Sequence, residues 1–384
     1  MHWQDGDDEL LALQLAVYQQ EDPTADEALL TRLIDAVRAR STPEPRPSFP
    51  SADRSLRLGP DTTGLTVESV IRFPELPTAL YPLLDPEQQP LLLVHVRNTS
   101  KQRRRVRVMA WLEGLSAQVV KTVELRPSES VLLPLSPTLL PHTLSTLDRL
   151  QWATLHVVAD DLDGKQERHD TFPVLCLART TGFNSAVLDP KTGQTHDLTR
   201  YYGAWITPFV EPVQELLRQA AELLPNQRMR GYQCPPAGLT VEQSTEEQVQ
   251  ALHHVLRKVD IAYVHSVINH GVPRRFLTQR TRLPRETLQA RSANCLDAVV
   301  LMGSLLEGAS LEPALVFVPG HAFIGWRAAP KVETWHFLEV SMLRGQDFDA
   351  TRKSGDTQYA RWKDVNLRFH PVAKLREERI WPME

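Results

Sequence analysis

Near the start of the chain, apolar residues recur at the spacing of amphipathic helices. Thr24 and Glu27 have the spacing of a capping box, and the apolar residues that follow them fall on one helical face. We therefore predict a short helical hairpin over residues 1–42. Residues 43–54 contain closely spaced prolines, which resist helix formation and predict an extended linker.

Between residues 55 and 180 the apolar residues come instead in short runs of β type, separated by polar or proline-containing turns. The runs are LLLVHVRN, RVRVMAWLEG, VVKTVELR, SVLLPLS, WATLHVVAD and HDTFPVLCLA. Strands at intervals of about ten to twenty residues are typical of antiparallel sandwiches. The pattern predicts an immunoglobulin-like β-sandwich, in which DDLDGK (160–165) forms a hairpin turn rather than a calcium loop.

Helical spacing returns after residue 200. The segment EPVQELLRQAAELLP (211–225) carries one apolar stripe and predicts a helix. Ser244 and Glu247 stand in capping-box register before a second stripe, so we predict that the next helix begins there. Farther along, EPALVFVPGHAFIGWRA and ETWHFLEVSML predict strands. We therefore expect an α+β domain over residues 200–384.

The segment SANCLDAVVLMGSLLEG (292–308) is apolar almost all round after its cysteine, which predicts a buried central helix. Asn294 or Ser292 is its predicted N-cap. Cys295 then stands in the first turn, where unpaired N–H groups and the positive end of the helix dipole favour a thiolate. A lone helical cysteine is usually a packing residue, so its neighbours must decide between nucleophile and core.

Two residues later in the chain, His321 and Glu339, are candidate partners of such a thiol. His321 stands at a predicted strand start, from which an imidazole can project toward the helix N-terminus as a general base. Glu339 falls inside an apolar strand pattern, so its carboxylate needs either a partner or an exposed face. If it bonds to His321, it orients the imidazole and stabilises the imidazolium, the third role in a catalytic triad. The alternative for Glu339 is an outward-facing strand residue.

The order Cys295, His321, Glu339, on a helix start followed by two strands, resembles the transglutaminase-like cysteine protease superfamily, whose fold is related to that of papain. The matching residues are SANCLDAVVLMGSLLEG, GHAF at 320–323 and WHFLE at 335–339. The resemblance covers residues 200–384. The chain departs from the family at Phe323, where Trp is frequent, and at Glu339, where the usual Asp is one methylene shorter.

Acyl transfer also needs an oxyanion hole, because charge develops on the attacked carbonyl oxygen. The backbone N–H of Cys295 is one predicted donor. Gln289, six residues earlier, has the Gln-to-Cys spacing of papain-like enzymes, and Gln279 is a second candidate. For both glutamines the alternative is an exposed surface residue.

Composition narrows the function class and the setting. The chain of 384 residues is long enough for two or three domains, and its net charge of −4 argues against a dedicated nucleic-acid binder. Three cysteines without a Cys-x-x-Cys pair fit free thiols in a reduced, cytoplasmic setting. The acidic first residues lack the basic start of a secretory signal, and no apolar run reaches the ~18 residues of a membrane span. We therefore expect neither export nor a membrane span.

The remaining histidines do not predict a metal site. His253 and His254 are adjacent and so point in different directions on a helix, and His265 and His270 have no cysteine or carboxylate at ligand spacing. Glycine-rich phosphate loops are also absent from the sequence. We expect neither a metal ion nor a cofactor.

Together these patterns predict thiol-dependent acyl transfer at amide bonds of a protein or peptide substrate. Release of the acyl-enzyme by water makes the protein a cysteine peptidase or amidase, which we prefer because the resemblance is to small prokaryotic members of the family; we accordingly expect a bacterial source. Release by an amine makes it a transglutaminase that crosslinks proteins. The competing class is a catalytically inactive interaction or scaffold protein, which binds a protein partner through the helical hairpin or the β-sandwich.

Overall fold

The computed structural model describes residues 64–384, apart from 165, 184–186, 189–194, 197 and 265–277. The predicted helical hairpin (1–42) and proline-rich linker (43–54) lie outside the described residues. Contacts divide the described chain into two units, which we call the β unit (64–182) and the C-terminal unit (183–384). Helices and several sheets are both present, so the predicted α+β class is correct at this level.

Side chains of the β unit alternate between core and surface along its strands. In β4 (Arg104–Leu112), every second residue from Val106 to Leu112 is fully buried, and the residues between them are not. This period of two makes the segment a half-buried strand. β1 (Leu65–Ile71) was not among the predicted runs, although its residues, LTVESVI, alternate in the same way.

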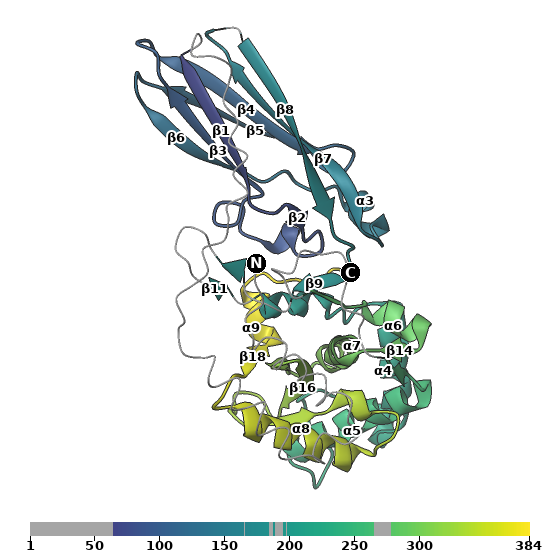
Figure 1. Cartoon of the computed structure of the whole chain (residues 1–384). Coiled ribbons are helices and arrows are strands. Elements are labelled where there is room, and N and C mark those ends of the chain that lie inside the picture. The colour runs from purple at the N-terminus through teal and green to yellow at the C-terminus, as the bar shows by residue number, and fades with distance from the viewer. Residues whose placement is uncertain (1–63, 165, 184–186, 189–194, 197, 265–277) are drawn as a thin grey trace, which may run out of the picture. The chain divides into compact units, whose positions relative to one another are not determined.

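The β unit contains two sheets, and in Figure 1 the strands of both run along one long axis. The five-stranded sheet has the order β2 (Glu75–Leu76), β8 (Gln166–Cys176), β7 (Gln151–Asp161), β4 and β5 (Val119–Leu125). The three-stranded sheet has the order β1, β3 (Leu92–Asn98) and β6 (Ser130–Leu135). Neighbouring strands are antiparallel except for β2 and β8, and β7 and β8 form the hairpin predicted around DDLDGK.

The short elements of this unit are η1 (Tyr81–Leu83) and α3 (Pro141–Thr146), and β9 (Thr181–Phe183) follows at its end. Cys176, at the end of β8, is buried and unbridged, and burial raises the pKa of its thiol to about 12. This thiol is therefore protonated and shielded at neutral pH.

In the C-terminal unit, α4 (Glu211–Glu222) forms where its apolar stripe predicts it. α5 (Val241–Val259) begins one turn earlier than predicted. Its N-cap is Thr240, whose hydroxyl accepts a hydrogen bond from the backbone N–H of Gln243, while the Gln243 side chain accepts one from the N–H of Thr240. The capping box predicted at Ser244 and Glu247 is wrong, because both residues lie inside the helix.

An antiparallel sheet of four strands lies beside α7 (Cys295–Gly308), which packs on its two central strands. The strand order is β17 (Trp335–Leu338), β16 (His321–Arg327), β15 (Pro313–Val318) and β18 (Arg368–Pro371). All six residues of β15 are buried. α7 is buried through almost its whole length, as its apolar run predicts.

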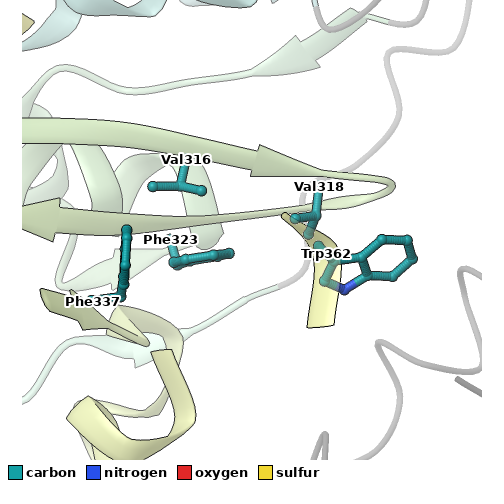
Figure 2. Close-up of a cluster of buried hydrophobic side chains, with 5 residues drawn as sticks. All are labelled: Val316, Val318, Phe323, Phe337 and Trp362. Carbon is teal, nitrogen blue, oxygen red and sulfur yellow. The ribbon is translucent and has the colours of Figure 1, made fainter. Parts of the chain in front are cut away.

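A cluster of buried side chains ties this sheet to α8 (Phe348–Trp362). It consists of Val316 and Val318 from β15, Phe323 from β16, Phe337 from β17, and Trp362 from α8 (Figure 2). Full burial of an aliphatic or aromatic side chain contributes about 1.5–3 kcal/mol. The cluster therefore fixes β16, which begins at His321, and β17, which ends just before Glu339.

α8 also approaches the backbone of β17 closely. A Cβ atom at Gly355 would lie 2.5 Å from the carbonyl carbon of Phe337 and 2.6 Å from the nitrogen of Leu338. Asp356 Oδ1 accepts a hydrogen bond from the N–H of Phe337 at 3.0 Å. Glycine is therefore required at position 355 for this contact.

The remaining elements are short or connect those above. They are β10 (Val187–Leu188), β11 (Thr195–His196), η2 (Thr199–Trp205), η3 (Pro225–Gln227), β12 (Ala262–Tyr263), β13 (Thr278–Arg280), α6 (Pro284–Ala290), β14 (Ser292–Ala293), η4 (Val340–Met342) and α9 (Val372–Glu377). None of the helices in the described part of the chain has both the length and the apolar character needed to span a bilayer.

Candidate functional site

Cys295 is the first residue of α7, and its side chain is largely buried. Asn294, not Ser292, is the N-cap: its Oδ1 accepts a hydrogen bond from the N–H of Asp297 at 2.8 Å. The carboxylate of Asp297 accepts in turn from the N–H of Asn294 at 3.2 Å, which completes a capping box. The thiol thus lies beside the free N–H groups at the positive end of a well-formed helix.

Arg282 holds the carboxylate of Asp297 from outside the helix. Its backbone N–H donates to Oδ1 at 2.6 Å, and its guanidinium donates to Oδ2 at 3.1 Å. Burial raises the pKa of Asp297, and hydrogen bonds from the backbones of Arg282 and Asn294 oppose that shift. The Asn-x-x-Asp spacing was visible in the sequence, but Arg282 as its partner was not.

His321 is the first residue of β16. Gly320 before it has a φ of +74°, the left-handed conformation that lets the chain turn between β15 and β16. The imidazole ring stacks beside Phe323, with centroids 6.4 Å apart and the planes 30° from parallel. Phe323 is itself held edge-to-face by Phe337. The buried cluster therefore fixes the direction in which the imidazole points.

Glu339 follows β17 and is not part of it, contrary to the strand predicted through Leu338 and Val340. It is the N-cap of η4, and its N–H donates to the carbonyl of Thr351 in α8 at 3.0 Å. The carboxylate Oε2 lies 2.6 Å from Nε2 of His321. Oε1 accepts hydrogen bonds from the N–H and the hydroxyl of Ser341 at 3.1 and 2.6 Å.

Charge and burial act against each other at this pair. Burial disfavours a charged imidazole, but the charge of Glu339, together with hydrogen bonds to Cys295 and Glu339, outweighs it and raises the pKa of His321 to about 10. Burial also disfavours a charged carboxylate, but the charge of His321 and the bonds from His321 and Ser341 hold the pKa of Glu339 below its usual value. The pair is therefore an imidazolium and a carboxylate at neutral pH.

The two predicted oxyanion glutamines lie in different surroundings. Nε2 of Gln279 in β13 lies 3.8 Å from Sγ of Cys295, at hydrogen-bonding distance for sulfur. Gln289 is exposed near the end of α6, and no hydrogen bond joins it to Cys295 or His321 among the described residues. The structure thus brings Gln279 to the thiol and does not bring Gln289 there.

Three contacts hold the segment that follows Gln279. The carbonyl of Arg280 accepts from the Asn294 side chain at 2.8 Å, and the carbonyl of Thr281 accepts from the indole N–H of Trp205 at 3.1 Å. The Arg282–Asp297 pair fixes the next residue. The N-terminus of α7 therefore positions both the thiol and the glutamine beside it.

Two tyrosines that sequence reasoning did not single out lie near the thiol. Tyr202 is buried in η2, and Tyr263 in β12 pairs in parallel with Ala293 of β14. Burial raises the pKa of both phenols, and the charge of Cys295 raises it further. Both side chains are therefore neutral at physiological pH, and nothing in their local sequence distinguishes them from core tyrosines.

A second histidine, His253, serves as a core residue. His253 in α5 is 2% exposed, its Nε2 lies 3.2 Å from the hydroxyl of Thr351, and its ring packs edge-on to Phe348. Burial and the charge of Arg257 lower the pKa of His253 to about 4. Within the described residues, no group of three or more His, Cys, Asp or Glu side chains is arranged to hold a metal ion.

Comparison with known proteins adds little to this geometry. No protein-family model matches the chain, and no curated protein matches it. Among solved structures, a FixG-related protein from Vibrio parahaemolyticus is similar at 12% sequence identity, over 29% of this chain and 96% of that chain, with a TM-score of 0.22. A likeness this weak supports no conclusion about fold or function. Function must therefore be inferred from the residues of the site.

Proposed function

We propose that the protein catalyses thiol-dependent acyl transfer at amide bonds, as a cysteine peptidase or amidase with the triad Cys295, His321 and Glu339. The observation that carries the proposal is the 2.6 Å contact between Nε2 of His321 and a buried carboxylate oxygen of Glu339. A largely buried imidazole bonded to a carboxylate, next to a thiol in the first turn of a helix, is an arrangement that activates a cysteine for nucleophilic catalysis.

We assign the resting site a Cys295 thiolate whose proton is already on His321, so the sulfur attacks the substrate carbonyl carbon directly. Because Nε2 of His321 bonds to Glu339, the other ring nitrogen, Nδ1, is the one assigned to the thiol. The bond from carbon to the leaving nitrogen then breaks, and that nitrogen takes the proton from His321. Water next attacks the thioester and transfers a proton to His321. The bond from carbon to sulfur then breaks and releases the acid, which restores the thiolate and the imidazolium.

The oxyanion that forms in each half of the reaction needs two donors. The backbone N–H of Cys295 and the side-chain amide of Gln279 are the donors we assign. The 3.8 Å between Nε2 of Gln279 and Sγ of Cys295 supports this assignment, because the attacked carbonyl lies next to the sulfur. The exposed position of Gln289 argues against it as an alternative donor.

We assign the C-terminal unit to the transglutaminase-like fold and the β unit to the immunoglobulin-like class of sandwich. The order of elements supports the first assignment. α7 is followed by the antiparallel strands β15, β16 and β17, which matches the order of the family's motifs. The contact of Glu339 with His321 supports it also, since the longer Glu side chain reaches the imidazole where the family usually has Asp. The two sheets of the β unit, antiparallel except for the pair β2 and β8, support the second assignment.

The decisive experiment compares the alkylation of the three cysteines by iodoacetamide in the full chain. At about pH 6, well below the ordinary thiol pKa of ~8.5, Cys295 is expected to react faster than the exposed Cys234, because only a thiolate paired with an imidazolium reacts at this pH. Cys176 should stay unreacted. Mass spectrometry of the peptides resolves the three sites.

His321→Ala should remove the fast reaction of Cys295. The matched control is His336→Ala, which removes a partly buried histidine of β17 that packs against Trp326. Equally slow alkylation of Cys295 in the unmodified chain and in His321→Ala would support a catalytically inactive scaffold.

Where the fast reaction is found, incubation of a peptide mixture with and without a fluorescent primary amine separates the two reactions. Hydrolysis gives the free acid, and transglutamination gives a peptide that carries the fluorescent amine.

A further inference from the structure

We propose that Ser341 is a positioning residue of this site, whose hydroxyl fixes the rotation of the Glu339 carboxylate so that Oε2 faces His321. The inference rests on the proposed function, because it gives Ser341 a part in the same proton transfer. Ser341 acts only through Glu339 and does not touch the reacting atoms.

The two oxygens of the Glu339 carboxylate have separate partners. Oε2 lies against Nε2 of His321 at 2.6 Å. Oε1 accepts from the hydroxyl of Ser341 at 2.6 Å and from its backbone N–H at 3.1 Å. The Glu339 side chain is 1% exposed, so these donors rather than bulk water satisfy the carboxylate.

Rotation of the carboxylate needs such a constraint. The last torsion of a glutamate side chain is broad and roughly two-fold, so a carboxylate held through one oxygen can turn and carry that oxygen out of the imidazole plane. Two bonds from Ser341 to Oε1 fix the plane. Glu has one more rotatable bond than Asp, and the bonds from Ser341 restrain the freedom that this bond adds.

The same hydroxyl supports the charge that His321 needs. Burial would raise the pKa of Glu339, and the charge of His321 lowers it together with hydrogen bonds from His321 and from Ser341. A hydroxyl donor stabilises the carboxylate over the acid. Loss of this donor therefore leaves less negative charge, in a less fixed position, to stabilise the imidazolium.

The test is the pH profile of Cys295 alkylation by iodoacetamide in the full chain, together with an NMR titration of the His321 ring. Ser341→Ala should slow alkylation at about pH 6 by about tenfold and lower the pKa of His321. Glu339→Gln should shift both quantities in the same direction and farther. Ser341→Thr keeps the hydroxyl and should restore both toward the unmodified values.

Ser304→Ala is the matched control. Ser304 is fully buried, and its hydroxyl donates to the carbonyl of Val300 and accepts from the N–H of Thr207, but neither bond reaches Glu339. This variant should lose stability without moving the pH profile. Should Ser341→Ala fail to fold, Ser341→Cys keeps the side-chain size with a weaker donor and should give an intermediate shift.

The outcomes separate the two proposals. A Ser341→Ala profile that matches the unmodified chain, while Glu339→Gln loses the fast reaction, overturns the role of Ser341 and leaves the triad standing. An equal shift of the alkylation pH profile in Ser304→Ala and Ser341→Ala also overturns it, because a general loss of stability would then explain both shifts. Unchanged alkylation in Glu339→Gln and His321→Ala instead overturns the proposed function itself.

Discussion

His253 is buried in the C-terminal unit and His321 is largely buried there, yet their surroundings leave the first ring neutral and make the second a cation. His253 packs between a hydroxyl and an aromatic ring, and burial with the charge of Arg257 lowers its pKa to about 4. At His321 burial acts in the same direction, but the carboxylate of Glu339 reverses it and the pKa rises to about 10. A buried histidine is therefore neutral by default, and a bonded carboxylate is what makes it a cation.

His253 and Glu339 both contact the same residue of α8, Thr351. The hydroxyl of Thr351 lies 3.2 Å from Nε2 of His253, and its carbonyl accepts from the N–H of Glu339 at 3.0 Å. The structural histidine thus helps to hold the helix against which Glu339 is placed. The variants below test how far the two environments differ, starting with the change that should have the largest effect.

Glu339→Gln should remove the difference between the two histidines. The amide keeps the size of the side chain but not its charge, so the pKa of His321 should fall toward the low value of a buried, unpaired ring. Turnover should decrease by about two to four orders of magnitude, as in triads that lose their carboxylate, and the free energy of unfolding at neutral pH should also fall, because the buried pair is broken. The rate of substrate cleavage and thermal unfolding measure the two effects.

Glu333→Gln is the control for this variant, because Glu333 is exposed in the turn before β17. Loss of turnover in Glu333→Gln with normal turnover in Glu339→Gln would mean that the wrong carboxylate has been assigned. Glu339→Asp is expected to be impaired as well, because a side chain shorter by about 1.5 Å loses the 2.6 Å contact unless β17 shifts.

The charged pair should also give stability a dependence on alkaline pH. The folded pKa of His321, about 10, is above the ~6.5 of an unfolded histidine, so its contribution is complete below about pH 6.5 and is lost as pH rises toward about 10. Chemical denaturation across this range should show a falling free energy of unfolding. The slope should be smaller in Glu339→Gln; an identical slope in both proteins would contradict the pairing.

Arg282→Ala tests a buried carboxylate whose partner is a permanent cation. It leaves Asp297, which is 1% exposed, with its backbone donors but without its guanidinium. We expect a loss of about 3–5 kcal/mol in the free energy of unfolding, measured by urea denaturation. Arg285→Ala removes an exposed arginine 3.7 Å from Glu384 and should cost less than about 1 kcal/mol.

His253 should make the protein sensitive to acid. Its folded pKa of about 4 is below the unfolded ~6.5, so its contribution is complete above about pH 6.5 and is lost as pH falls toward about 4. The loss should reach up to about 3 kcal/mol, and His253→Gln should flatten the acid limb of the stability curve. An unchanged acid limb in that variant would show that other groups cause the loss.

The sequence predicted which helices and strands form better than it predicted where each one begins and ends. α7 and the strands around His321 follow from periodicity, and the cap of α7 is Asn294, one of the two residues that the sequence offered. The start of α5 was misplaced because Thr240 with Gln243 and Ser244 with Glu247 offer the same capping spacing one turn apart. Nothing in a local pattern decides between two such starts, since the choice depends on what the helix packs against.

The carboxylate and the glutamine of the site show a second kind of limit. Alternation through Leu338 and Val340 extended the predicted strand across Glu339, whereas the chain turns there because the carboxylate caps η4. Gln279 lies beside the thiol and Gln289 does not, although Gln289 is nearer in sequence. Both outcomes depend on contacts between distant segments, which residue spacing does not encode.

The close approach of α8 to β17 makes position 355 a determinant of the site, although it lies far from the thiol in sequence. The atoms that a Cβ would meet belong to the backbone of Phe337 and Leu338, so no rotation of a side chain can make room for it. Any other residue must push the helix outward, and the carbonyl of Thr351 that holds Glu339 moves with it. In a library of all single substitutions, position 355 should therefore be as intolerant as the triad itself, with loss of activity preceding loss of expression.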